Sequence, residues 1–106
     1  MSLDVSLVVD GEEVFERNIT HNLGKMAKEA GFYFAAWCPE EAGLSKAKQL
    51  SFFLEVGIIS MLRNKRSLEK FNAENGWGEY KDLLEFAIAY AIACNQYPDA
   101  EVVVSR

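Results

Sequence analysis

Apolar and polar residues alternate at the start of the chain. Leucine or valine occupies every second position here, at Leu3, Val5, Leu7 and Val9. This period of two is typical of a β-strand with one buried face. Asp10-Gly11 then supplies a turn signal, and residues 15–19 return to an extended pattern. The pattern therefore predicts a β-hairpin over residues 3–19 that turns at residues 10–13.

The register of this hairpin depends on the length of its loop. A two-residue loop pairs Leu7 with Val14. An odd-numbered loop instead places Val9 opposite Phe15, and this is the register that we favour. The residue pattern alone leaves both registers open.

A short helix with one apolar face is predicted after the hairpin. Its apolar residues recur at helical spacing, at Leu23, Met26, Ala27 and Ala30. Thr20 or Asn22 can cap its start, and Gly31 suits the position just beyond its end. The aromatic stretch from Phe32 to Trp37 follows. We expect this stretch to fill the core from a connecting segment.

Ser45 can cap the second predicted helix, which runs to about Asn64. One broad face of it is apolar: Ala47, Leu50, Phe53, Leu54, Ile58, Met61 and Leu62. Phe52, Val56 and Ile59 lie outside that stripe. A helix that is apolar nearly all round is either buried on two sides or contacts a partner. The pattern therefore suggests a dimer interface on this helix.

The last third of the chain predicts one more long helix and a strand. Helical spacing of apolar residues continues from Tyr80 to about Asn95, and Pro98 prevents a longer helix. Residues 100–105 are rich in valine and are predicted to join the hairpin as a strand. These elements predict a single α+β domain over residues 1–106. It has a small antiparallel sheet of about three strands, the first strand central, and three to four helices packed on one face.

Composition and charge narrow the classes of function. Half of the 106 residues are hydrophobic and a quarter are charged, which is typical of a globular domain. Eleven basic against sixteen acidic residues give a formal net charge of −5, which disfavours a general nucleic-acid binder. The apolar stretches are shorter than the ~20 residues that cross a bilayer, and no leader is visible. We therefore expect a cytoplasmic protein without a membrane span.

Residues that commonly hold metals or act as nucleophiles are scarce. His21 is the single histidine, and Cys38 and Cys94 lack the short spacing of metal ligands. We interpret both cysteines as reduced, buried and inert. The sequence therefore predicts no metal site, no cofactor and no catalytic set.

Two segments carry candidate contact residues. Thr20-His21-Asn22 lies where a strand leads into a helix, and such a junction can hold an anion beside unpaired N–H groups. Helix capping alone also explains these residue types, and we favour it. Asn75-Gly76-Trp77-Gly78 with Tyr80 can present an aromatic surface. Tryptophan is highly buried on average, so we favour Trp77 as a core anchor.

A ligand site is predicted only if these segments meet. The candidate ligand or partner contacts are Thr20, His21, Asn22, Trp37, Asn75, Trp77 and Tyr80. If His21 and Asn22 approach Trp37 or Trp77, the imidazole is placed to act as a hydrogen-bond donor or general base.

Four sets of residues form a recognisable combination. They are Ile19-Thr20-His21-Asn22-Leu23-Gly24-Lys25-Met26-Ala27, Trp37 with Pro39-Glu40-Glu41, Asn75-Gly76-Trp77-Gly78 with Tyr80, and Tyr97-Pro98-Asp99-Ala100. The combination spans nearly the whole chain and resembles a family of small bacterial and phage-associated proteins. The chain departs from that family at residues 52–62, which are more hydrophobic, and at Cys38, where a basic residue is expected. The resemblance implies a bacterial or phage setting and no particular activity.

The sequence favours a non-enzymatic protein-interaction module. Surplus apolar surface on the second helix suggests self-association as a homodimer, or binding to another protein. One alternative is a small-ligand site or minor enzyme that uses His21 and Asn22 near Trp77. Another is a phage-type regulator with weak nucleic-acid contact through Arg63 to Lys70, although a solvated helix end also explains this basic cluster.

Overall fold

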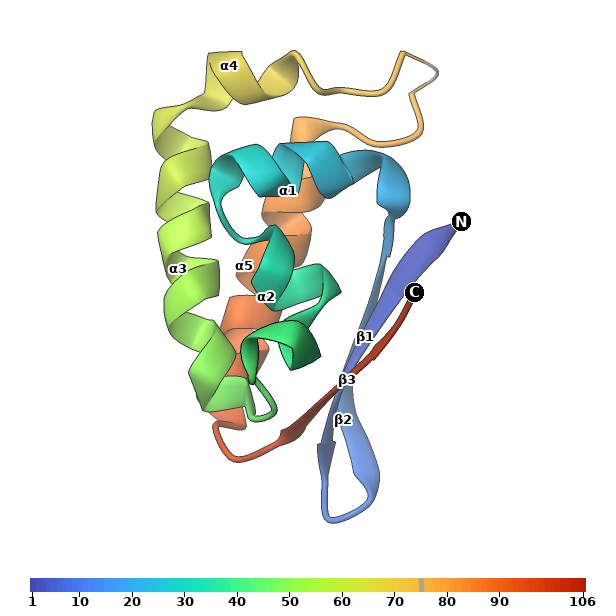
Figure 1. Cartoon of the computed structure of the whole chain (residues 1–106), viewed down its shortest axis with the longest axis vertical. Helices are drawn as coiled ribbons and strands as arrows, with labels where there is room; N and C mark the ends of the chain where they lie inside the picture. The colour runs from blue at the N-terminus through green and yellow to red at the C-terminus, as the bar shows by residue number, and fades with distance from the viewer. Residues whose placement is uncertain (75) are drawn as a thin grey trace.

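A computed structural model describes residues 1–74 and 76–106 and shows a sheet covered on one face by helices (Figure 1). The antiparallel sheet contains β1 (Ser2–Val9), β2 (Glu12–Thr20) and β3 (Glu101–Ser105) in the order β2-β1-β3. The N-terminal strand is therefore central, and the C-terminal strand pairs with its other edge. This arrangement confirms the predicted α+β fold.

All helical segments lie between β2 and β3 in the sequence. They are η1 (His21–Leu23), α1 (Gly24–Ala30), α2 (Tyr33–Trp37), η2 (Pro39–Ala42), α3 (Ala47–Arg63), α4 (Lys65–Glu69) and α5 (Tyr80–Gln96). The two longest helices, α3 and α5, pack side by side, and α5 also packs against β2 (Figure 1). The described residues thus form five α-helices rather than three to four, because α2 and α4 are separate helices of five residues each.

The register of the hairpin differs from the one we favoured. Asp10 and Gly11 form a two-residue turn, and their positive φ angles of 50° and 81° suit the type I′ geometry of tight hairpins. A bulge then leaves Val14 without an opposite residue, so that Leu7 faces Phe15. Because of the bulge, the hairpin has both a short turn and an inward-facing Phe15. Neither of the two predicted pairings occurs.

The segment after the hairpin is more helical than predicted. Helix α1 ends as expected at Gly31, whose φ of 90° favours glycine. Residues 33–37 form helix α2, a helix that the sequence pattern did not predict in this connecting segment. The expectation that the aromatic stretch fills the core is confirmed, because Phe32 and Trp37 are both buried.

Helix α3 begins one residue later than predicted. Its N-cap is Lys46 rather than Ser45, and the Gln49 side chain accepts hydrogen bonds from both backbone N–H groups at 2.9 Å. The buried residues of α3 are Ala47, Leu50, Leu54, Gly57 and Met61. Leu62, which the pattern assigned to the core face, is exposed instead. The exposed apolar surface of α3 is therefore larger than the sequence indicates.

Tyr90 places a polar atom in the core without a partner. Its ring is buried, stacks on Phe15 and packs against the edge of Phe86, with both centroid distances at 5.7 Å. Among the described residues, no group forms a hydrogen bond with its hydroxyl. Burial raises the pKa of this hydroxyl. An unpaired buried hydroxyl of this kind costs about 1–3 kcal/mol.

Replacing Tyr90 by phenylalanine is expected to increase the free energy of unfolding by about 1 kcal/mol, because the ring stays and the unpaired hydroxyl is removed. Urea unfolding followed by circular dichroism measures this change. Tyr80→Phe is the matched control and should lower stability, since the Tyr80 hydroxyl donates to the Met61 carbonyl at 2.6 Å. If both variants lose stability equally, the assignment of an unpaired Tyr90 hydroxyl is wrong.

Candidate functional site

The junction of β2 and η1 shows a capping interaction. The Thr20 hydroxyl accepts a hydrogen bond from the Asn22 N–H at 3.2 Å. Thr20 itself is extended, with φ of −67° and ψ of 141°, as is usual for an N-cap residue. The structure therefore uses Thr20 to begin the helical segment.

His21 and Trp37 lie together, although sixteen residues separate them in the sequence. The Trp37 indole Nε1–H donates a hydrogen bond to His21 Nδ1 at 3.0 Å. The indole is buried, stacks on Tyr33 with centroids 5.2 Å apart, and is tilted against Phe86 at 6.4 Å. His21 thus satisfies the polar atom of a large core side chain.

This hydrogen bond determines which nitrogen of His21 carries the proton. An indole N–H is a donor only, so Nδ1 must be the acceptor and the neutral ring holds its proton on Nε2. A general base needs an unprotonated nitrogen directed at its substrate. In this arrangement His21 offers a donor at Nε2, and the geometry gives no support to the general-base role considered from the sequence.

His21→Ala is expected to lower the free energy of unfolding by about 1–3 kcal/mol, because it leaves the buried indole N–H without an acceptor. Thermal or urea unfolding measures the loss. In the double variant with Trp37→Phe, the donor is absent, so removing His21 should cost clearly less than in the wild type. Equal costs in the two backgrounds would show that the hydrogen bond contributes nothing.

Asn22 connects the junction to the loop before α5. Its side-chain Nδ2 donates to the backbone carbonyl of Trp77 at 3.0 Å. The Trp77 side chain is 72% exposed, so our preference for a buried anchor is wrong. Tyr80, by contrast, is buried and adds almost no aromatic surface beside Trp77. Asn75, the remaining candidate in this loop, lies outside the described residues.

The candidate residues that the structure describes line separate hollows. His21 and Asn22 line one hollow, and Thr20 and Trp77 line a second. Tyr80 belongs to a third hollow, which follows α5. The Trp37–His21 bond joins the junction to α2, and the Asn22–Trp77 bond joins it to the loop before α5. None of these three hollows is lined by both partners of either bond.

Neither thiol is activated. Burial raises the pKa of the Cys94 thiol to about 12. Burial, together with Glu41 and Glu40, also raises the pKa of Cys38, which is half-buried rather than buried as expected. Thiols are nucleophilic only when deprotonated, so both cysteines are poor nucleophiles at neutral pH. Within the described chain, both are free thiols.

Exposed apolar side chains gather on α3. Four large residues on its outer side face solvent: Phe52 is 66% exposed, Val56 48%, Ile59 56% and Leu62 61%. The sequence pattern pointed to the first three as lying outside the core stripe. It missed Leu62, because that residue sits at the border of the stripe in a helical projection.

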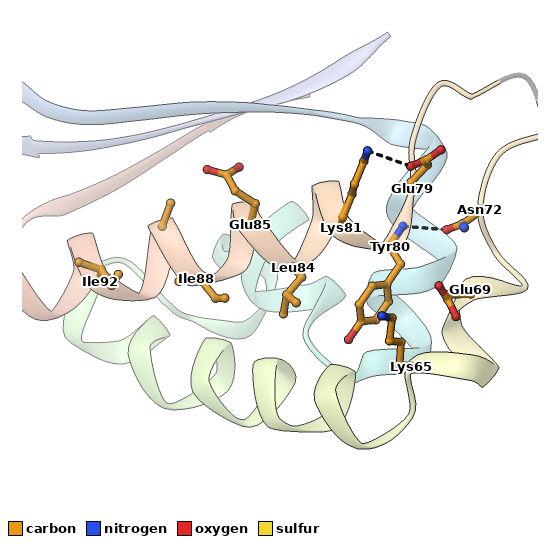
Figure 2. Close-up of a pocket in the computed structure, with 11 residues that line it drawn as sticks. Lys65, Glu69, Asn72, Glu79, Tyr80, Lys81, Leu84, Glu85, Ile88 and Ile92 are labelled. Atoms are coloured by element: carbon orange, nitrogen blue, oxygen red, sulfur yellow. Dashed lines mark hydrogen bonds and ion pairs between the residues drawn. The ribbon is translucent and has the colours of Figure 1, made fainter.

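A second apolar region lies on α5 (Figure 2). Leu84, Ile88 and Ile92 follow one another along a hollow of about 660 Å³, and its polar lining carries both charge signs. Lys81, for example, pairs with Glu79 at 3.5 Å. In all, Glu69, Glu79 and Glu85 contribute three carboxylates to the lining, against the two amines of Lys65 and Lys81.

The described part of the chain contains no group of three or more histidine, cysteine, aspartate or glutamate residues arranged to hold a metal ion. None of the helices found there is long and apolar enough to cross a membrane. Comparison with known protein families, curated proteins and solved structures found no match to this chain.

Proposed function

We propose that this protein is a self-associating interaction module in which the outer side of α3 binds the same surface of a second copy. We call this surface the α3 face and define it by Phe52, Val56, Ile59 and Leu62. Each of these side chains is about half exposed or more, and all lie opposite the buried side of the helix. Clustered apolar side chains on one exposed helix face are typical of protein-binding surfaces. This exposed stripe is the observation that carries the proposal.

Charge favours a second copy as the occupant of the α3 face. Glu55 and Arg63 are exposed on the same side of α3, and their charges cancel, whereas the whole chain has a formal net charge of −5. Neither forms an ion pair with any described residue. A neutral apolar surface that carries one unpaired charge of each sign is complementary to itself.

Other parts of the molecule support an enzymatic function less than the α3 face supports an interaction module. The His21 imidazole accepts a hydrogen bond from the core, and the two thiols are protonated at neutral pH. The basic cluster from Arg63 to Lys70 is interrupted by Glu69 and belongs to a chain with excess acidic residues. These observations favour an interaction module over the ligand-binding and nucleic-acid alternatives.

Sedimentation velocity tests the proposal over a range from low to several hundred micromolar protein. The wild type should show concentration-dependent dimerisation. Ile59→Lys should raise the dimer dissociation constant about tenfold or more, because each dimer then desolvates two lysines against apolar side chains.

Val103→Lys is the matched control for this substitution. Val103 is also a β-branched residue, is 47% exposed, and lies on β3, away from α3. It should leave the dissociation constant unchanged, and circular dichroism checks that both variants fold. A wild type that stays monomeric throughout, or an Ile59→Lys variant that dimerises as well as the control, contradicts the proposed function.

A further inference from the structure

The residues before and after Ile59 in the sequence match in chemical type, except that the charge four positions away changes sign. Val56 and Leu62, each three positions away, are both apolar. Glu55 and Arg63, each four positions away, have opposite charges. All five residues lie within α3 and are exposed. The α3 face therefore has a natural centre at Ile59.

A two-fold axis through that centre makes the pattern self-complementary. When two helices cross antiparallel about residue 59, each residue before the centre meets the residue equally far beyond it on the other copy. Val56 then meets the partner's Leu62, and Glu55 meets the partner's Arg63. Within one copy, Glu55 and Arg63 are about 12 Å apart along the helix, too far to pair with each other.

We propose that two copies bind through antiparallel α3 helices, with the two-fold axis at Ile59 and two reciprocal ion pairs between Glu55 and the partner's Arg63. This inference rests on the proposed self-association and adds its orientation, its register and the residues that determine them. The apolar residues supply the contact, and the charges select the direction.

A parallel arrangement of the same faces is disfavoured by the charges. With the two helices parallel and in register, Glu55 lies beside the partner's Glu55, and Arg63 beside the partner's Arg63. Like charges at such a contact repel each other. The two orientations therefore respond differently to charge reversal, which makes them separable by experiment.

Charge reversal is the first test. In the antiparallel dimer, Glu55→Arg or Arg63→Glu alone creates two like-charged contacts, and each should raise the dimer dissociation constant about tenfold at low salt. The double variant Glu55→Arg with Arg63→Glu restores both opposite pairs and should return the constant to within about threefold of the wild type. In a parallel dimer, neither single change alters the number of like-charged contacts.

Cross-linking is the second test and reports position directly. In a Cys38→Ser background, Ile59→Cys places a thiol on the proposed two-fold axis and should give a disulfide-linked dimer under mild oxidation. Phe52→Cys is the control, because in the antiparallel register its two copies lie about 21 Å apart along the helix axis. It should remain unlinked, whereas a parallel dimer links both variants.

The outcomes separate this inference from the proposed function. Two outcomes overturn the antiparallel register and leave self-association standing. In the first, Ile59→Lys loses the dimer but the double charge reversal does not restore binding. In the second, Phe52→Cys and Ile59→Cys are linked equally. Dimerisation that Ile59→Lys does not weaken overturns both. Rescue by the double reversal and selective linking at residue 59 support both.

Discussion

Replacing Gly57 by alanine is expected to lower the free energy of unfolding by about 2–3 kcal/mol, although alanine is the better helix former. Gly57 lies on the core side of α3, directly against the Phe32 ring. A β-carbon built at residue 57 would lie 2.8 Å from Phe32 Cγ and 3.0 Å from its Cβ, closer than such atoms normally approach. Phe32 is fully buried, so its ring has little room to move. The cost of overpacking therefore exceeds the ~1 kcal/mol that alanine contributes through helix propensity.

Chemical denaturation of four variants identifies the cause of this loss. Ser60→Ala, on the same helix, is the control and should change stability by less than about 0.5 kcal/mol. Phe32→Ala removes the Cγ and the ring that meet the new β-carbon. The Gly57→Ala, Phe32→Ala double variant should therefore be more stable than the sum of the two single losses implies. Strict additivity would mean that the contact with Phe32 does not limit residue 57.

The elements that the sequence predicted well are those with a long, regular period. The alternation from Leu3 to Val9 marked β1, and the 3.6-residue spacing after Tyr80 marked α5. Both patterns are long enough for the buried face to be recognised without knowing what covers it. The central position of β1 was also predicted from the sequence, because the long helical connection can bring β3 to the free edge of the hairpin.

Features that depend on a single residue or on distant contacts were predicted less well. The bulge at Val14 changes the register through one extra residue, and the alternation on β2 is too short to reveal it. Helix α2 is only five residues long, which is too short to show a helical period. Its aromatic composition therefore determined the prediction. Leu62 sits at the border of the apolar stripe, where the tertiary contacts of α3 decide its exposure.

The candidate site illustrates the same limit. The sequence named Trp37 and Trp77 as possible neighbours of His21, but only the fold shows that the Trp37 indole donates to the imidazole. It also singled out Trp77 and favoured its burial on the average behaviour of tryptophan. Trp77 departs from that average because it is exposed, and Trp37 is the tryptophan that fills the core.

The contrast between the two tryptophans leads to the largest expected effect. Trp37→Ala should lower the free energy of unfolding by about 3–5 kcal/mol, since it removes a buried aromatic side chain and leaves a cavity. The loss includes the stacking on Tyr33 and the contact with Phe86, and it leaves His21 Nδ1 without its donor. For a domain of this size, a loss of 3–5 kcal/mol is a large part of the total stability.

Trp77→Ala makes the same chemical change at a residue that is 72% exposed, and it should cost less than about 1 kcal/mol. Circular dichroism during urea unfolding suits both variants, because it does not depend on tryptophan fluorescence. Trp37→Phe should lie between them, because it keeps an aromatic ring in the core and loses only part of the volume. If Trp77→Ala were the more damaging change, the loop before α5 would be the anchor of the core, and α2 would not be. The two single substitutions thus decide which tryptophan anchors the core.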